Sequence, residues 1–544
     1  MKKLIKMQTP QQLTELLADL VSIESISLSE QEKLFPFRLK DILLSTNYFQ
    51  EHPELVEIHS TDDNRSYLTA LYRHQKATKT IVLISHFDVV NVEEYGDIRH
   101  LAFSVHELTK AITEQKESFS EEVRRDIKSG DYLFGRGILD MKCGLVLHLS
   151  LLEKAALEKW PINLLLLTVP DEEVCSVGMR TAVTKLLEIS HTYKLNYSLF
   201  LNSEPVFSQK PGDESFYAYT GSIGKIMPAA LFYGQETHVG EPLSGVNAAW
   251  MASILTKNIE WNMKFSEVVQ GERTPLPSTL YLKDLKQNYS AQTPHRAAAF
   301  YNVFLMERSA KEVIDLYLEL ARESVQEMND QLTGVLEREG LTKQKIDIKV
   351  LTYEELANYA INKYGQSYVD HIITEINEPE KLDDREMSIH IVDLFSIYCQ
   401  ELAPMVIIFF TPPYYPAVHS GHEKEISELI DKLRSFAREQ FSLVIKPVSF
   451  FNGISDLSYV SYKGSMTGWE SFEKNTPVWG ERYFIPFTEM EQLAAPVLNV
   501  GPFGKDAHKK TERLNIQNAF EVLPSLLEHL VKTHMDSPPK KAMR

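Results

Sequence analysis

The sequence predicts an α/β protein: a mixed, mostly parallel β-sheet with helices on both faces, together with an inserted α+β domain. Three observations predict it. Between residues 80 and 205, segments typical of buried strands alternate with segments typical of helices, which is the pattern of a parallel sheet. Each of these strands ends in polar residues, and such sheets carry their sites at the carboxyl ends of the strands. After about Lys210 this alternation stops, which indicates a second compact unit within the chain.

The composition fits an ordinary globular protein of more than one domain. The chain has 544 residues, of which 43% are hydrophobic and 24% charged. A chain of this length is too long to fold around one simple core. The formal net charge of -18 argues against nucleic acid or an anionic membrane as the main partner. Three cysteines cannot build a disulfide framework, and we find neither a signal peptide nor a run that could span a bilayer. We therefore expect a cytoplasmic protein without nucleic-acid or membrane partners.

The first part of the sheet domain is predicted over residues 1–211. Thr9 and Pro10 are typical of a capped helix start, uninterrupted apolar runs predict buried strands, and a charged, poorly periodic stretch at 91–131 predicts a surface excursion. In chain order the elements are a helix in "QQLTELLADLV", a strand in "TKTIVLISHF", the 91–131 stretch, a loop and helix in "GRGILDMKCGLVLHLSLLEKAALEKW", a strand in "INLLLLTVPDEE", a helix in "SVGMRTAVTKLLEI" and a strand in "NYSLFLNSEP".

The remaining chain is predicted to hold the inserted domain and the end of the first domain. Over 212–353, "FYAYTGSIGKIMPAALFYGQETHV" and "AAAFYNVFLM" indicate strands, and "SAKEVIDLYLELARESVQEM" indicates a helix. The acidic stretch 354–384 is predicted to be a further, helical insertion. Strand–helix alternation then resumes over 385–544, beginning with "PMVIIFFTPP", so we expect these residues to complete the first domain.

Histidines and acids gather at the ends of the predicted strands. The buried strand "IVLISHFDVV" carries His86 and Asp88, which alternation places on one face. The other strand ends and the loops after them carry Asp140, Glu172, Glu173, Glu204 and His508. Singly, such an acid is usually a solvated loop residue or a helix cap, and such a histidine is usually a satisfied core residue.

Together these residues suit a pair of divalent metal ions, with zinc, manganese or cobalt all chemically suitable. In such a site one carboxylate bridges two ions about 3.5–4 Å apart, and a water between them becomes a nucleophile. One member of the Glu172–Glu173 pair can then bind metal while the other moves protons. Asp88 can accept a hydrogen bond from the far nitrogen of His86 and so orient its ring.

Five motifs, in order along the chain, carry a family resemblance. "SHFDVV", "GRGILDMKCG", "PDEEVCSVG", "NSEP" and "GKDAHKKTE" together resemble the di-zinc peptidase family of aminoacylase, succinyl-diaminopimelate desuccinylase and glutamate carboxypeptidase, in peptidase clan MH. The chain length, the insert after "SHFDVV" and the segment "FFNGISDLSYV" look most like its bacterial arginine-utilisation branch. The resemblance implies a zinc-peptidase catalytic domain, with the inserted α+β unit as lid and dimerisation domain.

The resemblance also implies a role for each motif residue. Asp140 would bridge two metal ions, with zinc expected and manganese or cobalt as alternatives. His86 and Glu204 would complete one metal site, and Glu173 and His508 the other. Glu172 would be the general acid/base and Asp88 the orienting acid. A cis peptide bond would join Asp140 to Met141.

Three further residues are implied in the inserted domain. His238, in "ETHVGEPLSGVNAAW", would stabilise the oxyanion in the partner subunit of a homodimer. Arg308 and Asn247 would bind substrate. For Arg308 an exposed arginine at a helix start is an equal alternative to a residue that holds a substrate carboxylate.

The implied activity is metal-dependent hydrolysis of an amide bond in a small molecule or short peptide, with arginine catabolism as an associated role. Glu rather than Asp at position 204 favours carboxypeptidase or deacylase action over aminopeptidase action. Cys143 and Cys175 stand where the family commonly has glycine. The alternative is a catalytically silent relative that binds metal, a ligand or a partner protein.

Overall fold

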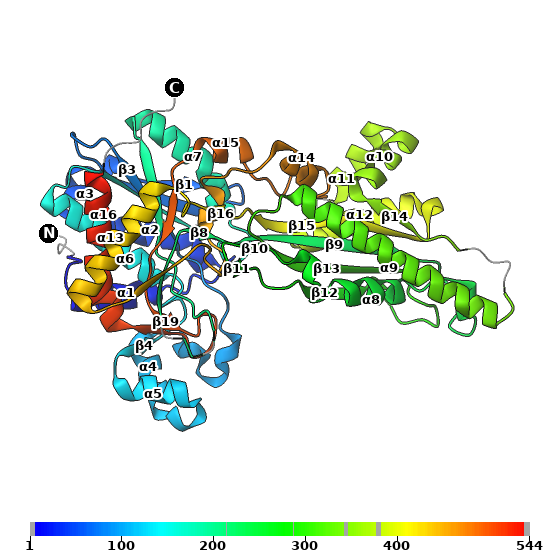
Figure 1. The fold of residues 1–544 in the computed structure, drawn as a ribbon, viewed down its shortest axis with the longest axis horizontal. Helices are drawn as coiled ribbons and strands as arrows, with labels where there is room; N and C mark the ends of the chain where they lie inside the picture. Colours follow the sequence, from blue (N-terminus) through cyan, green and yellow to red (C-terminus); the bar gives the residue numbers. More distant parts are fainter. Residues whose placement is uncertain are drawn as a thin grey trace. The chain divides into compact units, whose positions relative to one another are not determined.

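The computed structural model (Figure 1) describes residues 6–210, 212–213, 215–286, 288–341, 346–376 and 382–537. Residue 211, the predicted end of the first segment, and residues 377–381 of the predicted helical insertion lie outside these ranges. The chain divides into two compact units. The first consists of Met1–Ile223, Val418–Tyr462 and Pro486–Arg544, and the second of Gly224–Ala417 and Lys463–Ile485.

The first unit is built on an eight-stranded sheet of order β1-β2-β5-β3-β6-β18-β7-β17. Its strands are β1 Val56–Ser60, β2 Ser66–Tyr72, β3 Thr80–His86, β5 Asn163–Val169, β6 Tyr197–Asn202, β7 Phe216–Tyr219, β17 Ile445–Val448 and β18 Val497–Asn499. β3 runs parallel to β5 and β6, and β18 runs parallel to β6, whereas β1 and β2 are antiparallel to their neighbours. The predicted mixed, mostly parallel sheet is therefore confirmed.

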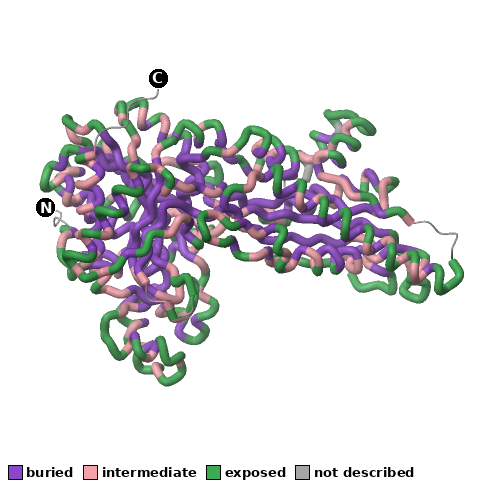
Figure 2. Tube along the Cα trace, in the orientation of Figure 1, coloured by how far each residue is buried: buried purple, intermediate pink, exposed green. Residues whose placement is uncertain are grey.

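The central strands form the core of this unit. Every residue of β3 and β5 is buried, as expected for parallel strands covered on both faces; Figure 2 shows the buried strands ringed by exposed turns. Outside residues 91–131, the α-helices of the unit in the described ranges are α1 Pro10–Val21, α2 Glu30–Leu43, α3 Asn47–Glu51, α6 Lys142–Glu158, α7 Val177–Tyr193, α13 Lys424–Phe441, α15 Phe487–Gln492 and α16 Leu523–Asp536. α1 begins with the predicted cap, because Thr9 and Gln12 form a capping box.

Residues 91–131 are more regular than their poorly periodic sequence suggests. They form η2 (Glu93–Leu101), α4 (Val105–Glu114), η3 (Lys116–Ser118) and α5 (Glu121–Ser129). Apolar residues of this insert, among them Tyr95, Leu108 and Ile112, gather in a small core of their own. The next strand, β4 (Tyr132–Phe134), pairs with β20 (Arg513–Asn515), which also pairs with β19 (Gly504–Lys505).

The second unit has its own five-stranded sheet, of order β12-β13-β9-β15-β14. The strands of this sheet and the α-helices of the unit are β9 Gly224–Tyr233, α8 Ala248–Ile259, β12 Ser278–Asp284, β13 Arg296–Leu305, α9 Ala310–Arg338, β14 Lys349–Thr352, α10 Tyr353–Tyr364, α11 Gln366–Ile376, α12 Asp384–Tyr398, β15 Met405–Tyr415 and α14 Met466–Lys474. The sheet is antiparallel except for the β14–β15 pair. β15 is the "PMVIIFFTPP" strand that the sequence assigns to the first sheet; it pairs instead with β9 and β14.

None of the helices within the described ranges combines the length and the apolar character that crossing a membrane requires.

Candidate metal centre

The strand register brings distant acids and histidines to one edge of the first sheet. His86 ends β3 and pairs with Val169, the last residue of β5, so the Pro170–Glu173 turn follows beside it. β6 ends at Asn202 alongside β3, which places Glu204 at the same edge. Asp140 comes from the turn before α6, and its peptide bond to Met141 is cis, as the resemblance implies.

These residues form two groups of candidate metal ligands that share Asp140. One group is His86, Asp140 and Glu204, and the other is Asp140, Glu173 and His508, with the ligand atoms of each group within 4.8 Å of one another. Asp140 Oδ1 lies 3.3 Å from His86 Nε2, while its Oδ2 lies 3.2 Å from His508 Nε2. The two carboxylate oxygens of Asp140 thus face different imidazoles.

The donors in these groups fit divalent metal ions. Two imidazoles and three carboxylates are the nitrogen and oxygen ligands that zinc, manganese and cobalt accept. Glu204 Oε1 is buried and has no hydrogen-bond partner among the described residues, and it lies 3.6 Å from His86 Nε2. A bound cation would satisfy a buried carboxylate oxygen in that position. Neither group of candidate ligands in the described chain includes Cys143 or Cys175.

Negative charge is concentrated in this cluster. Burial raises the pKa of Glu172 well above its ordinary value, and the neighbouring carboxylates of Glu204 and Glu173 raise it further. Burial also raises the pKa of Glu204. For Asp140 burial acts in the same direction, but hydrogen bonds from His508 and His86 outweigh it and lower the pKa. Bound cations would offset this excess of buried carboxylates.

Asp88 organises the residues around the centre. Its backbone carbonyl lies 3.0 Å from His86 Nδ1, whereas its carboxylate Oδ1 lies 3.5 Å from that nitrogen. The carboxylate accepts the backbone amides of Glu172 and Glu173 at 3.0 and 3.2 Å. The main-chain carbonyl of Asp88 therefore orients the ring of His86, and its carboxylate holds the turn that carries the two glutamates.

Sequence reasoning missed a buried ion cluster behind that turn. Arg65 Nη1 donates to Asp171 Oδ1 at 2.7 Å and to Glu32 Oε1 at 3.1 Å, and Glu32 also accepts the amide of Asp171. Asp171 has φ of 73°, so these contacts hold a residue in the left-handed region directly before Glu172. No local pattern marks Arg65, which lies 106 positions from Asp171 in the sequence.

Two more acids near the centre were also missed. Glu512 Oε1 accepts the backbone amides of Leu139 and Asp140 at 3.2 and 3.4 Å, and its other oxygen accepts from Arg136 at 2.5 Å. Asp456 is buried at the start of η7 (Asp456–Tyr459), where burial raises its pKa to about 7. Its segment "FFNGISDLSYV" was the available signal, because that segment already stands out in the family resemblance.

The other predicted site residues lie in the second unit. His238 is exposed on the loop after β9, and its Nδ1 accepts the Gly240 amide at 3.1 Å. Asn247 caps α8, with its Oδ1 accepting the Ala249 amide at 2.9 Å. Arg308 is half-buried between β13 and α9, and its backbone amide donates to Glu267.

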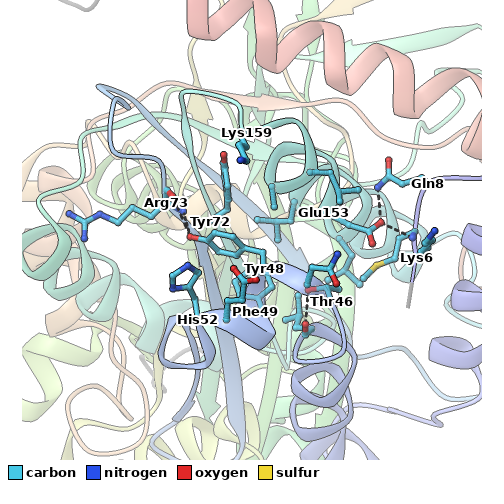
Figure 3. Close-up of a pocket in the computed structure, with 18 of the residues that line it drawn as sticks. Lys6, Gln8, Thr46, Tyr48, Phe49, His52, Tyr72, Arg73, Glu153 and Lys159 are labelled. Carbon is cyan, nitrogen blue, oxygen red and sulfur yellow. Dashed lines mark hydrogen bonds between the residues drawn. The ribbon is translucent and has the colours of Figure 1, made fainter. Parts of the chain in front are cut away.

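A pocket of about 840 Å³ lies elsewhere in the first unit (Figure 3). The rings of Tyr48 and Tyr72 line it, together with apolar residues of α6. Tyr72 pairs with Leu164 near the start of β5, whereas the metal candidates follow the end of β5 at Val169. The pocket is therefore at the opposite edge of the sheet from the candidate centre.

Comparisons with known proteins identify the family. Residues 82–464 match peptidase family M20/M25/M40. The chain is 41% identical over 529 residues to protein YqjN of Bacillus subtilis (strain 168), covering 96% of each chain. It is 30% identical over 556 residues to Protein RocB of the same organism, covering 98% of this chain and 97% of the relative.

Among solved structures, the fold is similar to that of an M20 family metallo-carboxypeptidase, Sso-CP2 from Sulfolobus solfataricus. The TM-score is 0.56 at 12% sequence identity, over 96% of this chain and 99% of that chain. The resemblance carried by the five motifs is confirmed at the level of the family. This chain belongs to peptidase family M20/M25/M40.

Proposed function

We propose that this chain is a metal-dependent hydrolase that cleaves an amide bond in a short peptide or an N-acyl amino acid. The observation that supports it most is Asp140, whose two carboxylate oxygens face His86 and His508 at 3.3 and 3.2 Å. This arrangement suits two divalent ions that share one carboxylate. Family membership makes hydrolysis the expected use of such a site.

Five residues would hold the two ions. His86 and Glu204 would bind one ion, Glu173 and His508 the other, and Asp140 both. Zinc is the ion we expect, with manganese and cobalt as alternatives that the same donors accept. When bound, the ions supply Lewis-acid polarisation of the substrate carbonyl and lower the pKa of the attacking water.

Glu172 is the residue that we assign to proton transfer. Its Oε2 lies 3.8 Å from His86 Nε2, beside the candidate ligands, and Asp88 holds its backbone amide. In this role Glu172 accepts a proton from the attacking water and then donates it to the leaving amine. One carboxyl thus serves first as general base and then as general acid.

We assign the second unit to substrate binding and dimerisation. Because the Gly240 amide donates to His238 Nδ1, the Nε2–H group of the ring is left to donate a hydrogen bond to an oxyanion in the partner subunit. The guanidinium of Arg308 would bind a substrate carboxylate. The Asn247 oxygen caps α8, which leaves the amide nitrogen of that side chain to contact substrate.

The nature of the substrate follows from analogy. Glu204, where aminopeptidases of the family have aspartate, favours a carboxypeptidase or a deacylase. The likeness to the arginine-utilisation branch makes N-acyl arginines and arginine-containing dipeptides the first compounds to test.

A metal add-back screen tests the proposal. Metal-free protein is incubated with zinc, manganese or cobalt and a panel of N-acyl amino acids and dipeptides, and the released amine is quantified. We expect at least one compound to be cleaved only when metal is present. The Glu172→Gln variant, purified identically, controls for contaminating peptidases. A folded, metal-loaded protein that cleaves nothing on the panel would contradict the proposal and favour the catalytically silent alternative.

A further inference from the structure

His508 occupies the least protected position among the candidate ligands. Its side chain is 45% exposed, whereas that of His86 is 1% exposed. Core packing therefore fixes His86 but cannot fix His508. The position of His508 depends on the backbone that carries it, which is the loop between β19 and β20.

That loop is internally bonded. Asp506 Oδ2 accepts from the hydroxyl of Thr511 at 2.8 Å and also from Arg513 Nη1. The backbone amide of Lys509 donates to the carbonyl of Asp506 at 3.0 Å. These bonds hold the loop in one conformation, so the placement of His508 depends on the two residues at the base of the loop.

Those two residues, Lys505 and Arg513, face each other across the β19–β20 pair, and both donate hydrogen bonds to one carboxylate of the insert. Asp126, on α5, accepts from Arg513 Nε at 2.9 Å and from Lys505 Nζ at 3.0 Å. Asp126 is 5% exposed and Arg513 is fully buried. A shielded, charge-assisted contact of this kind is stronger and more directional than a surface ion pair.

Residues that follow the insert contact the same hairpin in two further places. β4, which directly follows the insert, pairs with β20, and the ring of Tyr132 lies under both cations of the hairpin, at 5.8 Å from Lys505 Nζ. Next to Arg513, Glu512 holds the amides of Leu139 and Asp140. The base of the hairpin therefore contacts both the insert and the turn that carries Asp140.

We propose that Asp126 is a positioning residue for His508, and that the insert at residues 91–131 sets the affinity of the metal site formed by Asp140, Glu173 and His508. The inference rests on the proposed two-metal site. Residues that orient metal ligands typically change metal affinity by about 10–100-fold when they are removed. His86 and Glu204 are carried by the end of β3 and the turn after β6, not by this hairpin, so we expect the affinity of the Asp140, Glu173 and His508 site to depend on Asp126 the more strongly.

Metal titration of the full-length protein tests the proposal. Asp126→Asn removes the charge at nearly constant volume. Lys505→Met removes one of the two cations that contact Asp126, together with the ion pair from Lys505 to Glu122, while leaving Arg513 paired with Asp126. Glu121→Gln, an exposed acid on the same helix, is the matched control, and His508→Ala is the reference for loss of the ligand itself. Zinc is titrated into metal-free samples against a chelating indicator, after circular dichroism has shown that each variant is folded.

We expect Glu121→Gln to bind two ions like the wild type. Asp126→Asn is expected to bind one ion normally and the second about 10–100-fold more weakly, and Lys505→Met to show a smaller loss in the same direction. If Asp126 only stabilised the fold, its replacement would lower the melting temperature and leave both metal affinities unchanged. Should Asp126→Asn not fold, Lys505→Met carries the test alone.

Two outcomes would overturn the inference in distinguishable ways. If His508→Ala binds both ions as tightly as the wild type, the proposed metal site is wrong and the inference falls with it. If His508→Ala loses the second ion but the folded Asp126→Asn and Lys505→Met variants keep both at wild-type affinity, only the role of Asp126 is refuted.

Discussion

Glu172 and Glu173 are neighbours in the chain, and Asp88 accepts both of their backbone amides, yet their carboxylates face different partners. Glu173 Oε1 lies 2.9 Å from His508 Nε2, within a candidate ligand group. Glu172 Oε2 lies 3.8 Å from His86 Nε2 and belongs to neither group in the described chain. The two adjacent carboxylates therefore have different surroundings, as the proposed roles of a ligand at Glu173 and a proton carrier at Glu172 require.

Amide substitutions at the two positions are expected to have different effects. Glu172→Gln keeps its zinc, because it removes no ligand, and loses about 10²–10⁴-fold in turnover, the usual contribution of a positioned general base. Glu173→Gln binds its second zinc ion more weakly. Zinc content and kcat on the best substrate from the screen are measured for both. Wild-type turnover by Glu172→Gln would remove this residue from the mechanism.

The candidate ligands could be predicted because each follows a recognisable strand or motif. The structure brings all five together, while their role as ligands remains a prediction. The supporting residues could not be predicted in the same way. Arg65 meets Asp171 across 106 positions and Arg513 meets Asp126 across 387 positions, and no local pattern marks either contact.

At the scale of single elements, α6 contains an unusual polar residue. His148 is fully buried on this helix, and neither of its ring nitrogens has a hydrogen-bond partner among the described residues. Burial lowers its pKa to about 3, so the ring stays neutral in the folded protein. A buried polar group without a partner typically costs about 1–3 kcal/mol.

Replacing this histidine is therefore expected to stabilise the fold. His148→Leu gains on the order of 1 kcal/mol at pH 7.5. In the unfolded chain the ring titrates near pH 6.5, whereas the folded chain excludes the proton until about pH 3. The wild type therefore loses stability as pH falls below 6.5, and the variant lacks this loss, so its advantage grows by about 1.4 kcal/mol per pH unit.

Urea unfolding at pH 7.5 and 5.5, at equal zinc load, measures the difference. If the difference in unfolding free energy between His148→Leu and the wild type were the same at both pH values, the His148 ring would not be the buried, neutral group described here.

Two elements show where sequence patterns stop being informative. The apolar run of β15 predicts a buried strand, which it is, but such a run does not say which sheet it joins. The insert at 91–131 is charged and poorly periodic because its helices are short and share a small separate core. Charge and weak periodicity are equally typical of irregular loops, so the pattern alone could not distinguish the two.

At the scale of the whole molecule, the fold class was predictable because alternating strands and helices are a long-range pattern. The ranges of the two units were harder to infer. β15 lies inside the five-stranded sheet, and α14 packs on α9, so residues far along the chain return to the second unit. Such returns depend on strand pairing, which the sequence of one strand does not specify.

The proposed dimer makes a prediction about subunit exchange. His238→Ala is expected to bind two metals normally and to lose about 10²–10³ in turnover, the usual cost of removing an oxyanion donor. Mixed with Glu172→Gln under conditions that exchange subunits, it is expected to regain activity, because one site of each mixed dimer has both residues intact. Each variant exchanged with itself is the control. An inactive mixture, despite demonstrated dimerisation and exchange, would show that His238 does not act across an interface.

In the proposed site both metal ions share Asp140, so the metal content of Asp140→Ala shows whether this carboxylate bridges them. Wild type, Asp140→Ala and the exposed-acid control Asp62→Ala are stripped of metal, reloaded with zinc, desalted and measured by elemental analysis against protein concentration. Wild type and control are expected to hold about two ions per chain, and Asp140→Ala to fall toward none, because both ions lose a shared ligand. Two tightly bound ions in a folded Asp140→Ala would contradict a metal site that shares Asp140.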